Sequence, residues 1–233
     1  MFFFGCTVDG QGGVSISDDT VKHPLSITTP AVVETVSRVH CSGKQTFAIT
    51  DSGELYTCGS NDNNELGRSG KRNTFNRCDA VEAFKITDVS SGDGFCICLT
   101  SDGKVIAWGK NDLGQLGAGN REPKEKPRPV TFPESILQVS AGAQHSVALT
   151  TSGNVLVWGG NRKGQLGDGQ LTSSCVPQIL PQLRHRPVVR VCCGENHTLA
   201  LTVTGNLYVW GDNAHGQLGL GKQIIFSYFT LLA

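Results

Sequence analysis

The sequence predicts an all-β fold, a β-propeller assembled from repeats of about fifty residues. Two markers return in step along the 233 residues: an aromatic or cysteine residue followed by glycine, and a Gly-Gln-Leu-Gly motif. The first marker occurs at Cys58-Gly59, Trp108-Gly109, Trp158-Gly159 and Trp210-Gly211. The second occurs at 114–117, 164–167 and 216–219, with Asn64-Glu65-Leu66-Gly67 as a degenerate first copy. No stretch shows a long 3.6-residue periodicity, so strands are expected throughout.

Both markers also occur near the N-terminus, where Phe4-Gly5 is followed by Gly10-Gln11-Gly12-Gly13. The chain therefore begins inside a repeat, and residues 1–33 are predicted to form a partial blade. Further repeats are expected at about 34–83, 84–133, 134–185 and 186–221.

A single repeat shows how a blade is built. Residues 146–150 and 155–158 are short runs rich in β-branched residues, and a tight turn at Gly153 separates them. This pattern favours a β-hairpin. One more strand is expected at 136–140 and an outer strand at 127–132 or 176–180. Four-stranded sheets in radial repetition are propeller blades.

The last residues, 222–233, leave the register of the repeats. They have no proline where Pro127 and Pro177 would predict one. We expect an apolar C-terminal tail outside the repeats. It is far shorter than the roughly twenty residues that a membrane span needs.

The loop after each aromatic-glycine marker keeps its frame and changes its chemistry from copy to copy. An asparagine recurs at Asn61, Asn111, Asn161 and Asn213, and we expect its side chain to cap the turn. Its neighbours vary, as a binding face requires. The candidate contacts for a protein partner are Lys110, Asp112, Arg162, Lys163, Asp212 and His215.

Other residues at fixed places in the repeat are predicted to be structural. They are Trp108, Trp158, Trp210, Gly109, Gly159, Gly211, His145 and His197. The two histidines share a slot three residues after the glycine of Ala141-Gly142 and Cys193-Gly194. Counted in the same way from Ser42-Gly43 and Ser91-Gly92, Thr46 and Phe95 fill this slot. We expect buried histidines that satisfy backbone groups between blades, rather than metal ligands or acid-base catalysts.

No catalytic site, metal site or cofactor site is expected. Gly216 to Lys222 matches the start of a phosphate-binding P-loop, but Gln223 replaces the magnesium-binding Ser or Thr. The same glycine spacing recurs at 114–119 and 164–169 as part of the repeat. No Ser/His/Asp set, carboxylate pair or metal-ligand spacing stands out.

Twenty basic and twenty acidic residues give a formal net charge of zero, so a nucleic-acid partner is not expected. The basic segment from Arg121 to Arg128 contains Glu122 and Glu125. It is interpreted as a solvated loop.

Nine cysteines without a CxxC pair suggest neither a disulfide framework nor a zinc ribbon. By their places in the repeat, Cys41, Cys58, Cys96, Cys98 and Cys192 are predicted to be small buried packing residues. This usage is typical of a reducing compartment, the cytosol or the nucleus.

The residues from Gly142 to Gly167 and from Gly194 to Gly219 resemble the repeat of the regulator of chromosome condensation family. They share Gly-x-x-His, Ala-Leu-Thr, a turn glycine and Trp-Gly-x-Asn-x-x-Gly-Gln-Leu-Gly. Kelch repeats have a similar length, but they would need a glycine doublet in each blade. The resemblance implies a seven-bladed ring of roughly 350 residues. About four and a half blades are present, so an open arc with partly apolar end faces is expected.

The resemblance also implies function. Propellers of this family bind small GTPases, chromatin proteins or ubiquitylation substrates. In HERC-type proteins the propeller precedes a HECT ubiquitin-ligase domain. This chain contains no such domain, so the resemblance implies ligase activity only for a longer product. The leading hypothesis is a non-catalytic protein-interaction module, either free or as the N-terminal part of a ubiquitin ligase or another larger regulator. The alternative is guanine-nucleotide exchange on a Ran-like GTPase. A third possibility is that the open arc aggregates or assembles with another chain.

Overall fold

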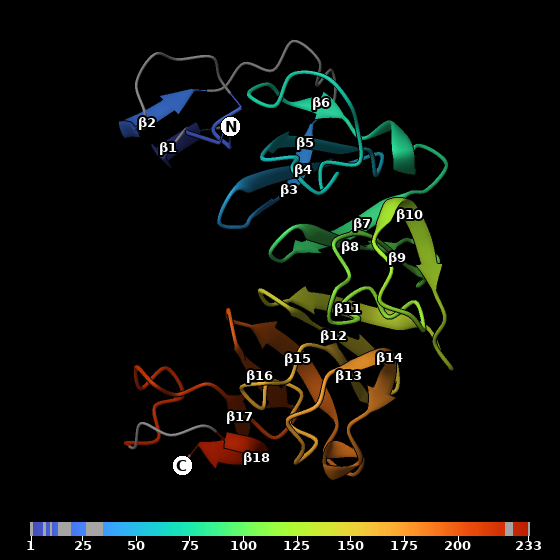
Figure 1. Ribbon diagram of the computed structural model, residues 1–233, viewed down its shortest axis with the longest axis vertical. Helices are drawn as coiled ribbons and strands as arrows, with labels where there is room; N and C mark the ends of the chain where they lie inside the picture. The colour runs from blue at the N-terminus through green and yellow to red at the C-terminus, as the bar shows by residue number, and fades with distance from the viewer. Residues whose placement is uncertain are drawn as a thin grey trace.

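The protein is described by a computed structural model that covers residues 2–6, 8–9, 11–13, 20–26, 35–221 and 226–232. Its strands form four antiparallel sheets of four strands and one sheet of two strands. In Figure 1 the sheets follow one another along an arc that is open on one side, where both ends of the chain lie. This confirms the prediction of an all-β, incomplete propeller.

Each four-stranded sheet is called a blade below. Blade 1 contains β3 (Val36–Cys41), β4 (Gln45–Thr50), β5 (Leu55–Gly59) and β6 (Asn76–Arg77). Blade 2 contains β7 (Ile86–Ser91), β8 (Phe95–Thr100), β9 (Val105–Gly109) and β10 (Lys124–Val130). Blade 3 contains β11 (Ile136–Ala141), β12 (His145–Thr150), β13 (Val155–Gly159) and β14 (Ser174–Ile179). Blade 4 contains β15 (Val188–Cys193), β16 (His197–Thr202), β17 (Leu207–Gly211) and β18 (Phe226–Leu232).

The partial N-terminal blade is the hairpin of β1 (Phe2–Cys6) and β2 (Thr20–Ser26). Two short 3₁₀ turns, η1 (Asp79–Val81) and η2 (Pro181–Leu183), lie before blades 2 and 4.

A threonine and a glycine fix the central hairpin of each blade. In blade 3, Gly153 has a φ of 84°, which a residue with a Cβ rarely adopts. The Thr150 hydroxyl accepts a 3.0 Å hydrogen bond from the backbone N–H of Asn154 across this turn. Equivalent bonds are made by Thr50, Thr100 and Thr202. The turn chemistry therefore sets the register of β12 against β13 and of its counterparts.

Neighbouring blades are joined by a recurring contact that we call the blade latch. In it, a tryptophan indole of one blade donates to a backbone carbonyl in the loop of the preceding blade. Trp158 and Trp210 donate to the carbonyls of Gln115 and Gln165, each over 2.8 Å. Trp108 donates over 3.1 Å to Glu65. Cys58 takes the tryptophan's place in blade 1, where its Sγ lies 3.4 Å from the carbonyl oxygen of Gln11.

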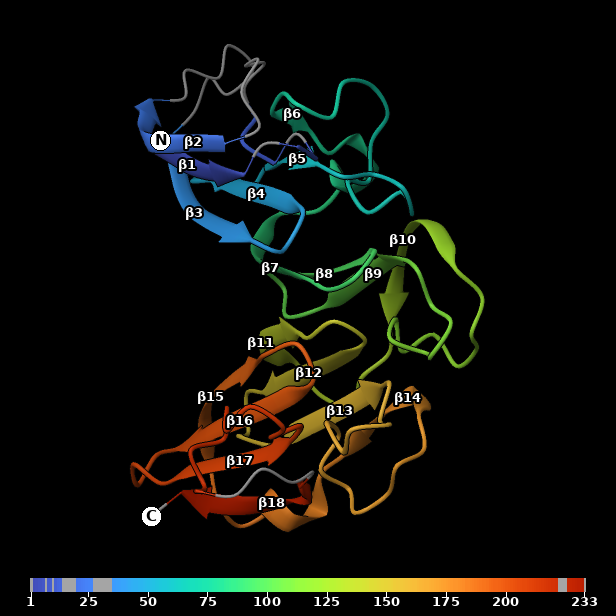
Figure 2. The ribbon, with the colours of Figure 1, turned by 60° about the vertical axis from the view of Figure 1, so that its left-hand side comes forward.

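The core lies between the blades, so the second strand of each blade is more deeply buried when neighbouring blades cover both of its faces. Every residue of β4, β8 and β12 is buried, because each of these strands is covered on both faces. Along β16, buried and half-exposed residues alternate. On β16 and β17, the half-exposed apolar side chains are Leu199, Leu201 and Leu207. Blade 4 thus carries the partly apolar end face that the sequence predicts, and it lies at the lower end of the arc in Figure 2.

The sheet register corrects one alignment made from the sequence. Gln45 pairs with Gly59, as Phe95 pairs with Gly109 and His145 with Gly159. Gln45, and not Thr46, therefore occupies the histidine slot in blade 1. The alignment was wrong because Ser42-Gly43 looks like Ser91-Gly92 but lies one residue later relative to the sheet.

The segment 222–233 was predicted to lie outside the repeats. Within it, β18 pairs with β17, with Leu207 opposite Leu232 and Gly211 opposite Phe226. This is the edge position that β14 holds in blade 3. Strand pairing uses backbone N–H and C=O groups, so it does not require the side chains of the repeat motif.

Candidate protein-binding site

The four loops that follow β5, β9, β13 and β17 share one internal frame. In each, the asparagine side-chain oxygen accepts a hydrogen bond from the backbone N–H of a leucine five residues later. The pairs are Asn61 with Leu66, Asn111 with Leu116, Asn161 with Leu166 and Asn213 with Leu218, at 2.8 to 3.0 Å. This confirms that the asparagine caps the turn.

The other end of the asparagine side chain holds the outer part of the loop. Asn111 Nδ2 donates to the carbonyls of Asn120 and Glu122, each over 2.9 Å. Asn161 Nδ2 donates to the carbonyl of Gln170 and to the carboxylate of Asp168, each over 3.0 Å. Asn111 and Asn161 are fully buried, so removing these bonds would leave unsatisfied polar groups.

The glutamine of the Gly-Gln-Leu-Gly motif holds the tip of the loop. Gln115 Oε1 accepts from the Leu113 N–H over 3.0 Å, and Gln165 Oε1 accepts from the Lys163 N–H over 2.9 Å. The same residue offers its backbone carbonyl to the blade latch. One motif thus fixes the loop tip and joins the blades.

In blade 1 the motif has Glu65 instead of glutamine. Its buried carboxylate accepts hydrogen bonds from Gln45 Nε2 at 3.0 Å, Ser60 Oγ at 3.2 Å and the Asn63 N–H at 2.7 Å. Gln45 supplies the donor that an acceptor-only carboxylate needs. The sequence showed the degenerate motif but did not predict that Gln45 would donate to Glu65, because the alignment placed Thr46 instead of Gln45 in the histidine slot.

The six candidate partner contacts do not share one environment. Asp112, Arg162, Lys163 and His215 are exposed on the loop tips, and Lys110 is half-buried. Asp212 is only 9% exposed, and its carboxylate accepts from the Ala214 N–H over 3.1 Å. Asp212 is therefore mainly part of the loop frame.

Two ion pairs link members of this set. Lys163 Nζ lies 3.9 Å from Asp212 Oδ2, which joins the tip of the blade 3 loop to blade 4. Lys110 Nζ lies 3.6 Å from Asp112 Oδ2 within one loop. The structure brings these pairs together and leaves Arg162 and His215 without an ion pair among the described residues.

A cavity of about 1020 Å³ opens on the inner side of the arc. It is lined by the inner strands β3, β7, β11 and β15, by the turns that follow them, and by parts of the loops after β5 and β13. Arg162 and Lys163 face it, together with Lys44, Asp93 and Glu195 from the turns. Two of the predicted contacts therefore line the cavity mouth.

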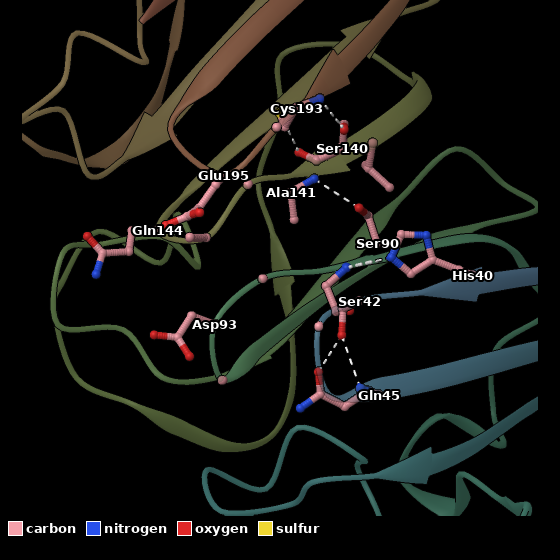
Figure 3. Close-up of a pocket in the computed structure, with 18 of the residues that line it drawn as sticks. His40, Ser42, Gln45, Ser90, Asp93, Ser140, Ala141, Gln144, Cys193 and Glu195 are labelled. Atoms are coloured by element: carbon pink, nitrogen blue, oxygen red, sulfur yellow. Dashed lines mark hydrogen bonds between the residues drawn. The ribbon is translucent and has the colours of Figure 1, made fainter. Parts of the chain in front are cut away.

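Figure 3 shows how the inner strands are tied to one another along this cavity. The Ala141 N–H donates to Ser90 Oγ, and the Cys193 N–H donates to Ser140 Oγ, each over 2.9 Å. At the equivalent place the Ser91 N–H donates to His40 Nε2 over 3.3 Å. Sequence analysis missed this ladder because a histidine and two serines share no motif. Their common feature is the ability to accept one hydrogen bond.

The two repeat histidines have different surroundings. His145 is fully buried, with Nε2 2.9 Å from Thr198 Oγ1 in blade 4. Because Thr198 donates its own proton to the Gln165 carbonyl, His145 is assigned as the donor from Nε2. His145 Nδ1 is buried and makes no hydrogen bond within the part of the chain that the structure describes. Burial, followed by nearby His197, lowers the pKa of His145 to about 3.

His145 therefore bonds to a side chain of the next blade rather than to a backbone group. His197 is half-exposed at the end face, and burial lowers its pKa as well. The lowered pKa keeps each imidazole neutral near pH 7.

The cysteine prediction is correct for three residues and wrong for two. Cys58, Cys96 and Cys98 are buried, whereas Cys41 and Cys192 are exposed. The exposed pair lies on inner strands, which face the cavity instead of a neighbouring blade. All cysteines with described side chains are free thiols. Burial raises the pKa of Cys58 to about 12.

The basic segment is also placed differently from the prediction. Residues 124–130 form β10, the edge strand of blade 2, rather than a loop. Lys126 and Arg128 are exposed on it, and so is Glu125, the residue before Lys126. Two prolines, Pro127 and Pro129, keep this edge from pairing with a further strand.

Within the described segments, no cluster of three or more His, Cys, Asp or Glu residues could hold a metal ion. In that same part of the chain, no helix is long and apolar enough to cross a membrane.

Comparison with known families gives a match over nearly the whole chain. The model described as "RCC1-like domain" matches residues 1–230. Human WBSCR16 has a similar structure, with a TM-score of 0.87 and 25% identity over 100% of this chain and 62% of its own. Prp20p of Saccharomyces cerevisiae has a TM-score of 0.83 at 20% identity, covering 93% of this chain and 54% of its own.

Matches to curated proteins are short. Protein RCC2 of Mus musculus is 51% identical over 47 residues, which is 20% of this chain and 9% of that protein. The probable E3 ubiquitin-protein ligase HERC3 of Homo sapiens is 45% identical over 51 residues, 22% of this chain and 5% of HERC3. The chain thus spans a small part of the length of these relatives.

Proposed function

Because the chain belongs to the RCC1-like domain family, we propose that it is a protein-interaction module that binds its partner through the loops after β5, β9, β13 and β17. The observation that carries this proposal is the contrast inside each loop. An asparagine and a glutamine, replaced by Glu65 in blade 1, hold four equivalent frames. The pair of residues after the asparagine differs from copy to copy, as Asp62-Asn63, Asp112-Leu113, Arg162-Lys163 and Ala214-His215. Variable chemistry on a rigid frame suits recognition of another protein.

The proposed contacts are the exposed tip residues Asp112, Arg162, Lys163 and His215. They carry both signs of charge, which favours a protein surface of mixed charge over a nucleic-acid backbone. The free thiols suit a reducing compartment, so we keep the cytosol or nucleus as the proposed location.

Relatives suggest partner classes to test. Prp20p was described together with its binding to Gsp1p and histones. Another relative is named X-linked retinitis pigmentosa GTPase regulator. A small GTPase and core histones are therefore the first purified probes. HERC3 is named as a ubiquitin ligase, so a ubiquitylation substrate is a further candidate if this module belongs to a longer protein of that kind.

The test compares three versions of the full chain: the natural sequence, a loop-tip variant and a matched control. The loop-tip variant carries D112A, R162A, K163A and H215A. The control carries D51A, D102A and K104A, which change exposed charges in the turns at the opposite end of the strands. Binding to each probe, and to proteins captured from a nuclear and a cytosolic extract, is measured for all three.

We expect a partner that binds the natural chain and the control but loses at least tenfold in affinity for the loop-tip variant. Equal binding by the loop-tip variant and the natural chain would contradict the proposed face. Guanine-nucleotide exchange, the alternative function, is tested in the same samples by release of labelled nucleotide from a Ran-type GTPase. Release well above the spontaneous rate would favour exchange over simple binding.

A further inference from the structure

The joint between blades 1 and 2 is built differently from the other two joints on its cavity side. Blades 2 and 3 are tied there by Ala141 N–H to Ser90 Oγ and by Asp93 N–H to the Ala143 carbonyl, each over 2.9 Å. All of these acceptors are groups that do not titrate.

Blades 3 and 4 are tied in the same way, by Cys193 N–H to Ser140 Oγ and by Ala143 N–H to the Glu195 carbonyl. Gln138 adds two bonds of 3.0 Å to the backbone N–H and carbonyl of Val191. These contacts between the inner strands of blades 3 and 4 also use only groups that do not titrate.

Between blades 1 and 2, the described residues of β3 and β7 make two polar contacts, and both involve groups that titrate. The Ser91 N–H donates to His40 Nε2 over 3.3 Å. Arg38 Nη1 lies 3.6 Å from Asp88 Oδ1. The first contact needs a neutral imidazole, and the second needs an ionised carboxylate.

The outer side of the same joint does not depend on pH. There the Trp108 indole donates to the Glu65 carbonyl over 3.1 Å. Around it, Phe47 and Ile49 of blade 1 pack with Ile106 of blade 2 in one buried apolar cluster. One side of the joint is therefore fixed while the other can be released.

We propose that the joint between blades 1 and 2 is an acid-sensitive hinge. Protonation of His40 turns Nε2 into an N–H donor that faces the N–H of Ser91, so the contact between β3 and β7 is lost. Blade 1 then pivots about the latch at Trp108 and widens the cavity on the side of β3. The loop tip at Asp62 and Asn63, which follows β5, moves with blade 1 relative to the other three loops.

The groups around His40 agree with this direction. On β4 it meets the uncharged ring of Phe47, with ring centroids 6.0 Å apart. Arg38 and Cys41 lie on its own strand, Asp88 lies on β7, and Lys44 and Asp93 lie on the adjoining turns of the same cavity. Burial lowers the pKa of His40 from 6.5 and raises the pKa of Asp88 from 3.8. Both contacts are therefore intact near neutral pH, and acid weakens both of them.

Amide hydrogen exchange on the full chain tests the hinge. The protection factor of the Ser91 N–H is measured from pH 7 to pH 4 and divided by those of Ala141 and Cys193, whose acceptors are serines. As pH falls below 6.5, the ordinary pKa of the side chain, the opened joint binds a proton that the closed joint does not, so this ratio should fall by up to about tenfold for each pH unit until the hinge is open. A ratio that stays constant over this range would overturn the proposal.

The matched variant is H40S, because serine fills the same place at Ser90 and Ser140. It should keep the ratio constant with pH, and a fall equal to that of the natural chain would exclude His40 as the switch. If H40S does not fold, NMR titration of the His40 imidazole in the natural chain replaces it. A pKa below 6.5, titrating together with the Ser91 amide shift, supports the hinge, and an amide shift with no matching transition overturns it.

Discussion

The indole Nε1 of Trp158 donates a 2.8 Å hydrogen bond to the backbone carbonyl oxygen of Gln115, which lies in the loop of the preceding blade. The same carbonyl oxygen receives the Ser146 hydroxyl, also at 2.8 Å. Gln115 uses its side chain to hold its own loop tip. The residue that shapes the proposed binding loop is therefore also the residue that joins two blades.

Removal of both donors to the Gln115 carbonyl should cost more than the sum of the single changes. Either W158F or S146A leaves this buried acceptor with one partner, whereas the double variant leaves it with none. Each single change should lower the free energy of unfolding by about 1–3 kcal/mol, and the double should exceed their sum by about 1 kcal/mol. Urea unfolding of the four proteins measures this, and strict additivity would contradict the shared acceptor.

Gly142 should tolerate no side chain, although its φ lies outside the left-handed region. A Cβ built there would overlap the ring of His145. We expect G142A to lower the free energy of unfolding by about 1–3 kcal/mol. The matched control is G43A, because a Cβ at Gly43 meets nothing within 4 Å.

The His145 ring can be shown to cause this cost. In blade 1 the equivalent places hold Ser42 and Gln45, so a residue with a Cβ is accepted where no ring lies over it. In an H145Q background the additional cost of G142A should therefore shrink. An unchanged cost would mean that another group, such as the Gly194 carbonyl, sets the limit.

His145 should make the protein less stable in mild acid. Its pKa is about 3 when folded, against 6.5 for the free side chain. Between these values the unfolded chain binds a proton that the folded chain does not. The contribution is therefore complete above pH 6.5 and is lost as pH falls, by up to about 1.4 kcal/mol per pH unit.

H145F is the control for the acid effect, because Phe95 fills the same slot in blade 2. Urea unfolding of both proteins between pH 7.5 and pH 4 gives the difference. The stability of H145F should fall less steeply below pH 6.5 than that of the natural chain. Parallel curves would show that His145 titrates normally in the folded protein.

The cysteines should divide into two reactivity classes. Cys41 and Cys192 are exposed on the cavity side, whereas Cys58, Cys78, Cys96 and Cys98 are buried. Burial raises the pKa of Cys78 to about 12, which removes its reactive thiolate at neutral pH. Iodoacetamide followed by mass spectrometry should label the first class in the native protein and the second only in denaturant. Early labelling of Cys96 or Cys98 would contradict the packing between blades 1 and 2.

Much of this fold could be predicted because the repeat carries it. The spacing of the Trp-Gly and Gly-Gln-Leu-Gly markers predicted the blades, and the recurring asparagine predicted a capped loop. Both predictions rest on local chemistry that one sequence segment contains. The predicted register of blade 1 was wrong for the opposite reason. The position of Gln45 is set by its pairing with Gly59 on the neighbouring strand, which local chemistry does not show.

Other features depend on contacts between residues that are far apart in the sequence, and no local motif predicts them. The ladder of His40, Ser90 and Ser140 joins residues about fifty positions apart through acceptors of different kinds. The exposure of Cys41 depends on the inner strand facing a cavity. β18 pairs through its backbone, so its unusual sequence gave no sign of a strand that completes blade 4.

The central claim is that each blade is locked to the next by a tryptophan. Hydrogen exchange of the three indole N–H groups, followed by proton NMR, tests it most directly, because the chain contains only three tryptophans and each one lies in a blade latch. Trp108, Trp158 and Trp210 report on the joints between blades 1 and 2, 2 and 3, and 3 and 4. All three indole N–H groups should exchange with deuterium more than about a thousandfold slower than a free indole. Exchange of any one of them at the rate of a free indole would show that its joint is not formed and would contradict the interlocked arc.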